Sequence, residues 1–285
     1  MGDRLPGLPW RGPGPGRPDG LALPPARMPL IRAGRLLKRW RYVGVYGPEL
    51  MLCAGSVHVG PAWQVWWAVW DRPARRLYER TRLARGRRAV QVERPGSLRV
   101  RDGDVEIDLR LDEGPGVEVV SPAGGAYVWT RKQGGVPAQG RVRLGGRERE
   151  LVARAVVDDS AGYHDRHTAW RWSAGVGAAA DGRALAWNLV DGIHDDPDAS
   201  ERTVWLDGVP TQVPPARFAA DLHEIAFAGG ERLRLAAEAT RRRRDRLLLF
   251  RSDYEQPFGT FAGSLPGGIE LVEGFGVTER HEVVW

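Results

Sequence analysis

Residues 97–114 read SLRVRDGDVEIDLRLDEG. Apolar side chains occupy every second position along this stretch, and Asp102-Gly103 and Glu113-Gly114 supply turn residues. A period of two residues is that of a strand with one buried face. The stretch therefore predicts half-buried β-strands separated by turns.

The same pattern continues through most of the chain. AWQVWWAVWD (62–71) has strand length, residues 140–160 form a hairpin pattern around Gly145-Gly146, and 267–285 contain another pair. Turn residues recur about every 8–14 positions, which is typical of β-sandwiches and barrels. Only 72–88 and 231–243 are candidates for helices. We therefore predict an all-β protein, whose many tryptophans suit barrel interiors.

The pattern breaks at two places, which we take as boundaries. Residues 1–34 are rich in Pro and Gly and predict a flexible or wrapped arm. The segment RKQGGVPAQG interrupts the strand pattern near 135–140. We expect two β-barrel domains after the arm, at 35–138 and 139–285.

Charge and composition narrow the classes of partner. The net charge is +6, but of 42 basic residues only Lys38 and Lys132 are lysines, as in proteins from high-GC genomes. Acidic residues interrupt the basic runs 75–88 and 241–246, so we expect solvated strand edges and no nucleic-acid site. We expect no membrane span, no secretory signal and, with Cys53 as the single cysteine, no internal disulfide. These features favour a cytoplasmic protein.

Residues 162–175, GYHDRHTAWRWSAG, hold the densest group of reactive side chains. Read as a strand, the stretch places Asp165 and His167 on one face and His164, Arg166, Trp170 and Trp172 on the other. The two histidines then point apart, so we expect no shared metal. The chain also has no zinc or calcium motif. Because two tryptophans favour the interior, we expect His164 to face a cavity and His167 with Asp165 to lie at the surface or between the barrels.

Other polar residues stand in strongly apolar segments and would need partners if buried. An interior Arg166 would need a carboxylate, for which Glu201 and Glu279 are the candidates. The wider set consists of Asn188, Glu201, Arg202, Tyr254, Gln256, Glu279 and His281. They either join strands in a polar network or line a ligand cavity.

Several blocks resemble a known family. They are the stretch from Asp158 through GYHDRHTAWRWSAG, then GRALAWNLVDGI, SERTVWLDG, QPFGTFAGSLPGG and EGFGVTERHEVVW, with KRWRYVGVYGPEL and VWTRKQGG before them. Together, over residues 35–285, they resemble the DUF2804 family of uncharacterised proteins. More distantly, the chain is similar to double-barrel lipocalin-like (calycin-type) proteins, which include carotenoid 1,2-hydratases and cyclases of Diels-Alder type. The resemblance implies two packed lipocalin-like antiparallel β-barrels and chemistry on hydrophobic molecules without a metal or organic cofactor.

These observations lead to one functional hypothesis and one alternative. The hypothesis is an enzyme of lyase or isomerase type that hydrates, cyclises or isomerises a hydrophobic small molecule without a cofactor. His164, Asp165, Arg166 and His167 are the catalytic candidates, with His164 as the proton donor. Trp170, Trp172, Asn188, Glu201, Tyr254, Gln256 and Glu279 are the ligand-binding candidates. The alternative is a non-catalytic carrier of an apolar metabolite or lipid. The oligomeric state stays open.

Overall fold

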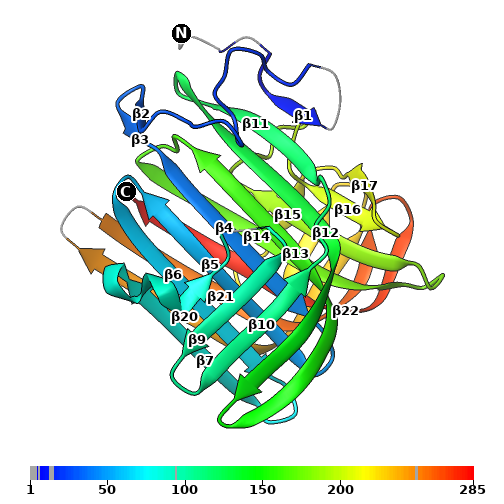
Figure 1. Ribbon diagram of the computed structural model, residues 1–285. Helices are drawn as coiled ribbons and strands as arrows, with labels where there is room; N and C mark the ends of the chain where they lie inside the picture. The colour runs from blue at the N-terminus through cyan, green and yellow to red at the C-terminus, as the bar shows by residue number, and fades with distance from the viewer. Residues whose placement is uncertain (1–4, 6, 13–15, 94, 248–249) are drawn as a thin grey trace.

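The protein folds into two strongly curled antiparallel β-sheets, seen in a computed structural model that describes residues 5, 7–12, 16–93, 95–247 and 250–285 (Figure 1). Each sheet has a path of nine neighbouring strands, and further strands join the first. The predicted all-β class is confirmed, and the two curled antiparallel sheets pack against one another.

The first sheet runs in the order β7-β6-β5-β4-β13-β12-β10-β9-β8, with β11 and β1 added through β12. Its strands are β1 (Trp10–Gly12), β4 (Lys38–Tyr46), β5 (Leu50–Val59), β6 (Ala62–Asp71), β7 (Arg76–Leu83), β8 (Val90–Gln91), β9 (Ser97–Asp102), β10 (Val105–Leu111), β11 (Val117–Ala123), β12 (Ala126–Leu144) and β13 (Arg147–Gly162). The quoted stretch 97–114 supplies β9 and β10, which pair around the Asp102-Gly103 turn as its alternation predicts.

The second sheet runs in the order β17-β16-β15-β14-β22-β21-β20-β19-β18. Its strands are β14 (His167–Ala179), β15 (Ala184–Asp191), β16 (Thr203–Leu206), β17 (Val209–Gln212), β18 (Ala216–Phe218), β19 (Glu224–Phe227), β20 (Arg232–Leu247), β21 (Phe250–Leu265) and β22 (Ile269–Val284). A separate small hairpin is formed by β2 (Ile31–Arg32) and β3 (Arg35–Leu36).

The chain passes from one sheet to the other at residues 163–166, later than the sequence suggested. The expected boundary between 138 and 139 falls inside β12, which pairs with β13 on both sides of that point. A register shift between Gly134 and Val136 explains the interrupted pattern there, because a bulge disturbs alternation without ending a strand. The division into two separately folding domains stays a prediction.

The two helix candidates are wrong. Residues 72–88 form β7 and part of a 3₁₀ turn, η1 (Ala84–Ala89), and 231–243 belong to β20. Strand β20 pairs with β21 along nearly its whole length, so a partner strand overrides the helix propensity of its Ala- and Arg-rich sequence.

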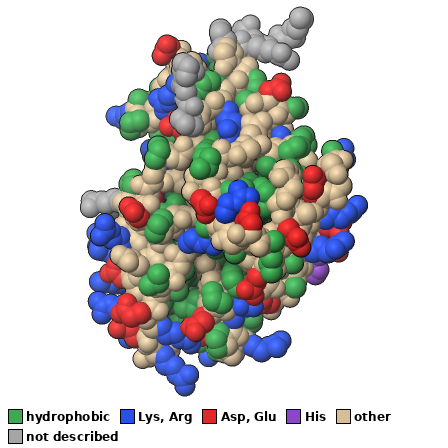
Figure 2. Space-filling model, turned by 90° about the vertical axis from the view of Figure 1, so that its right-hand side faces the viewer, with side chains coloured by type: hydrophobic (Ala, Val, Ile, Leu, Met, Phe, Trp, Pro, Cys, Tyr) green, Lys and Arg blue, Asp and Glu red, His purple; other side chains and the backbone are tan. Residues whose placement is uncertain are grey.

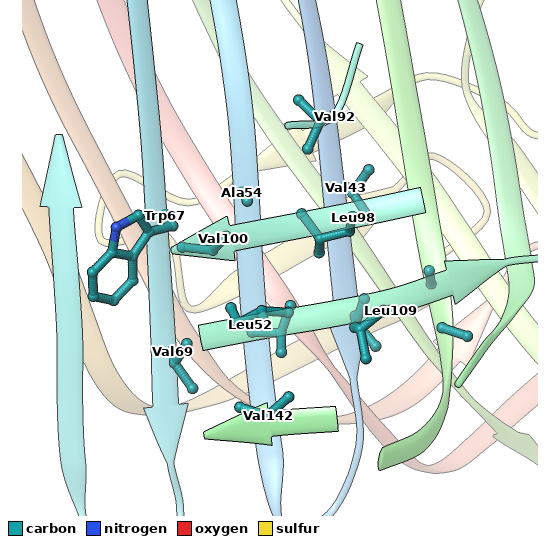
Figure 3. Close-up of a cluster of buried hydrophobic side chains, with 14 of the residues drawn as sticks. Val43, Leu52, Ala54, Trp67, Val69, Val92, Leu98, Val100, Leu109 and Val142 are labelled. Carbon is teal, nitrogen blue, oxygen red and sulfur yellow. The ribbon is translucent and has the colours of Figure 1, made fainter. Parts of the chain in front are cut away.

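Each sheet encloses a hydrophobic core of its own. In the first, Leu98 and Val100 of β9 face Leu52 and Ala54 of β5, because the sheet curls until its distant strands cross over one another (Figure 3). The core of the second sheet is built around Trp187, with Leu233 and Phe261 among its members.

A third core joins the two sheets. Its members include Tyr42, Tyr46 and Met51 from the first sheet and Trp172 and Trp205 from the second. Strand β4 is therefore buried on both faces: Val43 and Val45 point into the first core, while Tyr42 and Tyr46 point towards the second sheet. This interface positions the site described below.

The described part of the N-terminal arm is wrapped against the first sheet. Strand β1 pairs with β11, and Leu23 and Met28 are buried. The Tyr127 and Tyr163 hydroxyls donate hydrogen bonds of 2.7 Å to backbone oxygens of the arm. Residues 1–4, 6 and 13–15 of the expected arm lie outside the described residues.

Basic and acidic side chains are interspersed on the surface (Figure 2). Many of them pair, as Arg99 does with Asp108. The expectation of no nucleic-acid site stays a prediction. Among the described residues there is no helix long and apolar enough to cross a membrane.

Candidate functional site

A cavity of about 450 Å³ lies between the two sheets, within the range of small-molecule sites. The first sheet contributes Trp40, Tyr42, Val57, Val59, Ala62, Trp63, Gln64, Trp66, Leu83, Lys132 and Asp158. The second sheet and its connections contribute Trp170, Trp172, Val190, Ile193, His194, Glu201, Arg241, Arg243, Asp245, Phe250, Ser252, Tyr254, Glu279, His281, Val283 and Trp285. The strands of both sheets therefore build one shared site.

Aromatic side chains from both sheets form its walls. Trp40 of β4 and Trp170 of β14 lie nearly parallel, with ring centroids 6.3 Å apart and planes 7° apart. Tyr42 meets Trp172 edge to face at 5.2 Å. Such walls bind apolar molecules, and their π-faces stabilise positive charge.

A buried carboxyl group, Glu279 of β22, stands in this aromatic wall. The Trp170 indole donates to Oε1 at 2.9 Å, and the Gln256 amide donates to Oε2 at 3.0 Å. Burial raises the pKa of Glu279 to about 7, with Asp158 adding to the rise, while hydrogen bonds from Trp170 and Tyr254 hold it down. Near neutral pH the carboxyl is therefore divided between its acid and its ionised form.

Further polar side chains line the same cavity as Glu279. The Arg241 guanidinium lies 4.9 Å from the ring centre of Tyr254, and its Nε is 3.0 Å from Oε2 of Glu79. His281 shares a 2.8 Å hydrogen bond with Ser252, and its ring centre is 4.5 Å from that of Trp170. Burial, aided by Arg241, lowers the pKa of His281 to about 3, so this imidazole is neutral at physiological pH.

A second polar cluster lines the cavity around Lys132 of β12. The Lys132 Nζ is 2.5 Å from Asp158 Oδ1 and 3.2 Å from Glu201 Oε1. His194 lies beside them, its pKa lowered to about 3 by burial and by the Lys132 charge. The His164 ring meets that of His194 edge to face at 5.6 Å.

The stretch 162–175 differs from the expected continuous strand. Strand β14 begins at His167, so alternation does not apply to the four residues before it. His164 is buried as expected, with its ring centre 4.7 Å from that of Trp40 and the two planes tilted by 30°, but it is not among the residues that line the cavity. Burial holds the pKa of His164 well below its usual value. The ring is therefore neutral at physiological pH and has no imidazolium proton to donate.

The interior position expected for Arg166 is wrong, because this residue is exposed in the connection before β14. Neither expected partner serves it: Glu201 faces Lys132, and Glu279 faces Trp170 and Gln256. With Arg166 in solvent, no buried charge there needs neutralising.

His167 and Asp165 lie at the surface as expected, but not as a pair. His167 Nε2 is 2.8 Å from Glu282 Oε1, and Oδ1 of Asp165 forms an ion pair with Nη2 of Arg35 at 2.6 Å. The side chains of His167 and Asp165 are 60% and 64% exposed, which places both outside the cavity.

The predicted ligand-binding residues are largely brought together. The cavity is lined by Trp170, Trp172, Glu201, Tyr254 and Glu279. Asn188 and Gln256 lie one layer behind: Asn188 accepts from Trp172 at 2.8 Å, and Gln256 supports Glu279. Arg202 is 1% exposed, and its guanidinium donates to the backbone oxygens of Asp195 and Asp196. It therefore stabilises the loop between β15 and β16 and is not a residue of the cavity wall.

Most of this chain matches the model of a known protein family. The model of the family described as "Domain of unknown function (DUF2804)" matches residues 78–285. The chain belongs to the DUF2804 family. No curated protein matches it.

The solved structures that are similar to this DUF2804 protein include the following three proteins. A putative AttH from Nitrosomonas europaea is 13% identical, over 85% of this chain and 91% of that one, with a TM-score of 0.47. Kievitone hydratase from Nectria haematococca is 10% identical, over 87% and 88%, with a TM-score of 0.49. The protein CghA is 10% identical, over 87% and 88%, with a TM-score of 0.47.

Sequence reasoning missed several lining residues of this DUF2804 protein. Lys132, Asp158, His194 and Arg241 were not named as site residues, and His281 appeared only among the polar residues of apolar segments. One signal was available: Lys132 is one of two lysines in a chain that otherwise uses arginine. Among the described residues, no group of three or more His, Cys, Asp or Glu side chains is arranged to hold a metal ion.

Proposed function

We propose that this protein is an enzyme that moves a proton to or from a hydrophobic small molecule bound between its sheets, using its own side chains. Glu279 carries the proposal, because it is a buried carboxyl group with a pKa of about 7 in the wall of an aromatic cavity. A general acid works best when its pKa is near the working pH, and it contributes ~10²–10⁴-fold to a rate.

The proposed step begins with protonated Glu279, which gives its proton to a carbon–carbon double bond of the ligand. The carboxylate left behind is stabilised by Trp170, Tyr254 and Gln256, and the cationic carbon faces the tryptophan walls. Water that adds to the cation and returns one of its protons to the Glu279 carboxylate gives hydration. Attack by a second double bond followed by loss of a proton to Glu279 gives cyclisation, and loss of a proton from a neighbouring carbon to Glu279 gives isomerisation.

Deuterium uptake tests this step whichever of the three products forms. Geraniol, nerolidol and β-ionone would first be screened for quenching of the cavity tryptophans, and those that bind would be incubated with the protein in D₂O. We expect carbon-bound deuterium in at least one ligand by mass spectrometry, and at least a 100-fold slower uptake with Glu279→Gln. Glu282→Gln is the matched control, since Glu282 is on the same strand with its side chain 56% exposed.

Ligands that bind but take up no deuterium would contradict the enzyme and favour the carrier, which needs only shape and apolar walls. Equal uptake by wild type and Glu279→Gln would contradict the role of Glu279.

A further inference from the structure

The cluster around Lys132 is not used by the proton transfer proposed for Glu279, yet it lines the same cavity. Lys132 comes from β12, Asp158 from β13, and His194 and Glu201 from the connection between β15 and β16. The exposed fractions are 2% for Lys132 and Glu201, 8% for Asp158 and 9% for His194. Four titratable side chains are thus held almost entirely away from water.

The charges of this cluster nearly cancel. Lys132 faces two carboxylates, and its pKa is raised by both of them despite burial. The pKa of Asp158 is raised by burial and by Glu201, which favours its protonated form. Lys132 lies 2.5 Å from Asp158 and 3.2 Å from Glu201, so the cluster supplies its own opposite charges and an ionic ligand group would add an uncompensated charge.

Three atoms of the cluster lack a hydrogen-bond partner among the described residues: Oδ1 of Asp158, Oε2 of Glu201 and Nε2 of His194. Oδ1 of Asp158 still has Nζ of Lys132 at 2.5 Å, which leaves Oε2 of Glu201 and Nε2 of His194 without a close polar neighbour in the described contacts. A buried polar atom without a partner destabilises the folded protein, so a ligand group that pairs with it gains affinity. A carboxylate oxygen only accepts, whereas a neutral imidazole nitrogen donates or accepts according to its tautomer. The complement of this pair is a group that donates one hydrogen bond and accepts another.

We propose that Glu201 and His194 bind a hydroxyl group of the ligand, which donates to Glu201 and accepts from His194. The inference rests on the proposed binding of a ligand in this cavity, and it names the class: hydrophobic alcohols or phenols. A ligand carboxylate would be repelled by Glu201, an ammonium group would face Lys132, and a carbonyl oxygen cannot donate to Glu201.

Matched probes test the hydroxyl group alone. The affinities of 4-hydroxybiphenyl and 4-methylbiphenyl, two molecules of nearly equal shape, would be measured by quenching of tryptophan fluorescence. The methyl compound is the more hydrophobic, so without a polar partner it would bind more tightly. We expect the hydroxyl compound to bind about 10-fold more tightly to the wild type.

Two variants locate the hydroxyl group. In Glu201→Gln, an amide replaces the accepting carboxylate, and we expect the preference for 4-hydroxybiphenyl to fall to 2-fold or less. Should circular dichroism show that Glu201→Gln is unfolded, His194→Phe carries the same expectation. Glu282→Gln is the control and should keep the preference, because the Glu282 side chain is 56% exposed and is not among the residues that line the cavity.

Three results would overturn the inference: no saturable quenching by 4-hydroxybiphenyl, equal affinity for the two probes, or an undiminished preference in a folded Glu201→Gln variant. A crystal structure of the complex with ordered water still at Glu201 and the ligand hydroxyl elsewhere would also overturn it. Failure of the proposed enzyme activity is separate, since a hydroxyl preference without deuterium uptake describes a carrier of hydroxylated ligands.

Discussion

The indole of Trp170 joins the acid of the site to its aromatic wall. Its Nε1 donates a 2.9 Å hydrogen bond to Oε1 of Glu279, while its ring lies parallel to that of Trp40 in the opposite sheet. In the register of β14 and β22, Trp170 is opposite His281 and Trp172 is opposite Glu279. The bond is therefore a diagonal contact between neighbouring strands, and it fixes the carboxyl group on the side of the cavity.

Trp170→Phe should raise the pKa of Glu279 further. The substitution keeps an aromatic ring and removes the hydrogen bond that lowers this pKa. Because the acid form is the proton donor, deuterium uptake should fall at a higher pH than in the wild type. A ¹³C NMR titration of the Glu279 carboxyl provides a second readout. The control is Trp285→Phe, since Trp285 lines the cavity but donates to Thr168. An unchanged titration in Trp170→Phe would contradict this role.

Glu279→Gln should gain stability relative to the wild type as the pH rises. The folded-state pKa of about 7 is above the usual 4.5, so the folded protein binds the proton more tightly than the unfolded chain. The wild type therefore loses this stabilisation between about pH 4.5 and 7, an amount on the order of 2 kcal/mol between pH 5 and 8. Asp158 and Arg241, which also act on Glu279, are present in both proteins.

Urea unfolding at pH 5 and pH 8 measures this difference, with Glu282→Gln as the control. The depressed pKa values of His194 and His281 make both proteins less stable as the pH falls below about 6.5, so they do not affect the comparison. A stability difference that does not change with pH would mean that Glu279 is ionised in the folded protein throughout.

The fold class could be predicted from the sequence because the alternation of apolar and polar residues is a local pattern. The alternation of 97–114 is a property of neighbouring residues, and the strands it predicts form as β9 and β10. The helix predicted at 231–243 is wrong because this segment pairs with β21 as strand β20. That pairing joins separate segments of the chain and leaves no local pattern in the sequence. The interruption near 135–140 has a related cause: the bulge near Gly134 resembles a strand end until its pairing with β13 is known.

The site was accessible only in part, because its geometry depends on how the sheets meet. Polar residues in apolar strands correctly indicated Glu279 and Tyr254, which line the cavity. Lys132 is in a strand of the first sheet and its partner Glu201 is in a loop of the second, so no local pattern links them. Strand alternation could not place Arg166, since the strand begins one residue later.

Glu113→Gln should lower the free energy of unfolding by about 3 kcal/mol. Oε1 of Glu113 is 2.5 Å from Nη2 of Arg41, and the two side chains are 6% and 7% exposed. Loss of the carboxylate leaves Arg41 buried with Asp159 as its remaining ionic partner. Glu148→Gln is the control: its pair with Arg141 spans 3.6 Å between exposed side chains, and we expect a change within about 0.5 kcal/mol by urea unfolding. Similar losses for both variants would contradict the importance of burial.

Gly134→Ala should disturb the contact between the two sheets. An added Cβ would lie 2.3 Å from Cε3 of Trp205, which belongs to β16 and to the core shared by the sheets. Real Cβ contacts are never so close, so the indole or the bulged strand must shift. We expect a loss of about 1–3 kcal/mol, as for other overpacked cores.

A smaller partner should relieve this cost. In a Trp205→Leu background the added methyl group has room, so Gly134→Ala should cost less than half as much, and the double-mutant cycle should show coupling. Gly114→Ala is the control, because no atom lies within 4 Å of its added Cβ. If Gly134→Ala lowers the free energy of unfolding by the same amount with tryptophan and with leucine at position 205, then the two sheets do not contact each other at Gly134 and Trp205. That result would contradict the arrangement of the cavity walls described above.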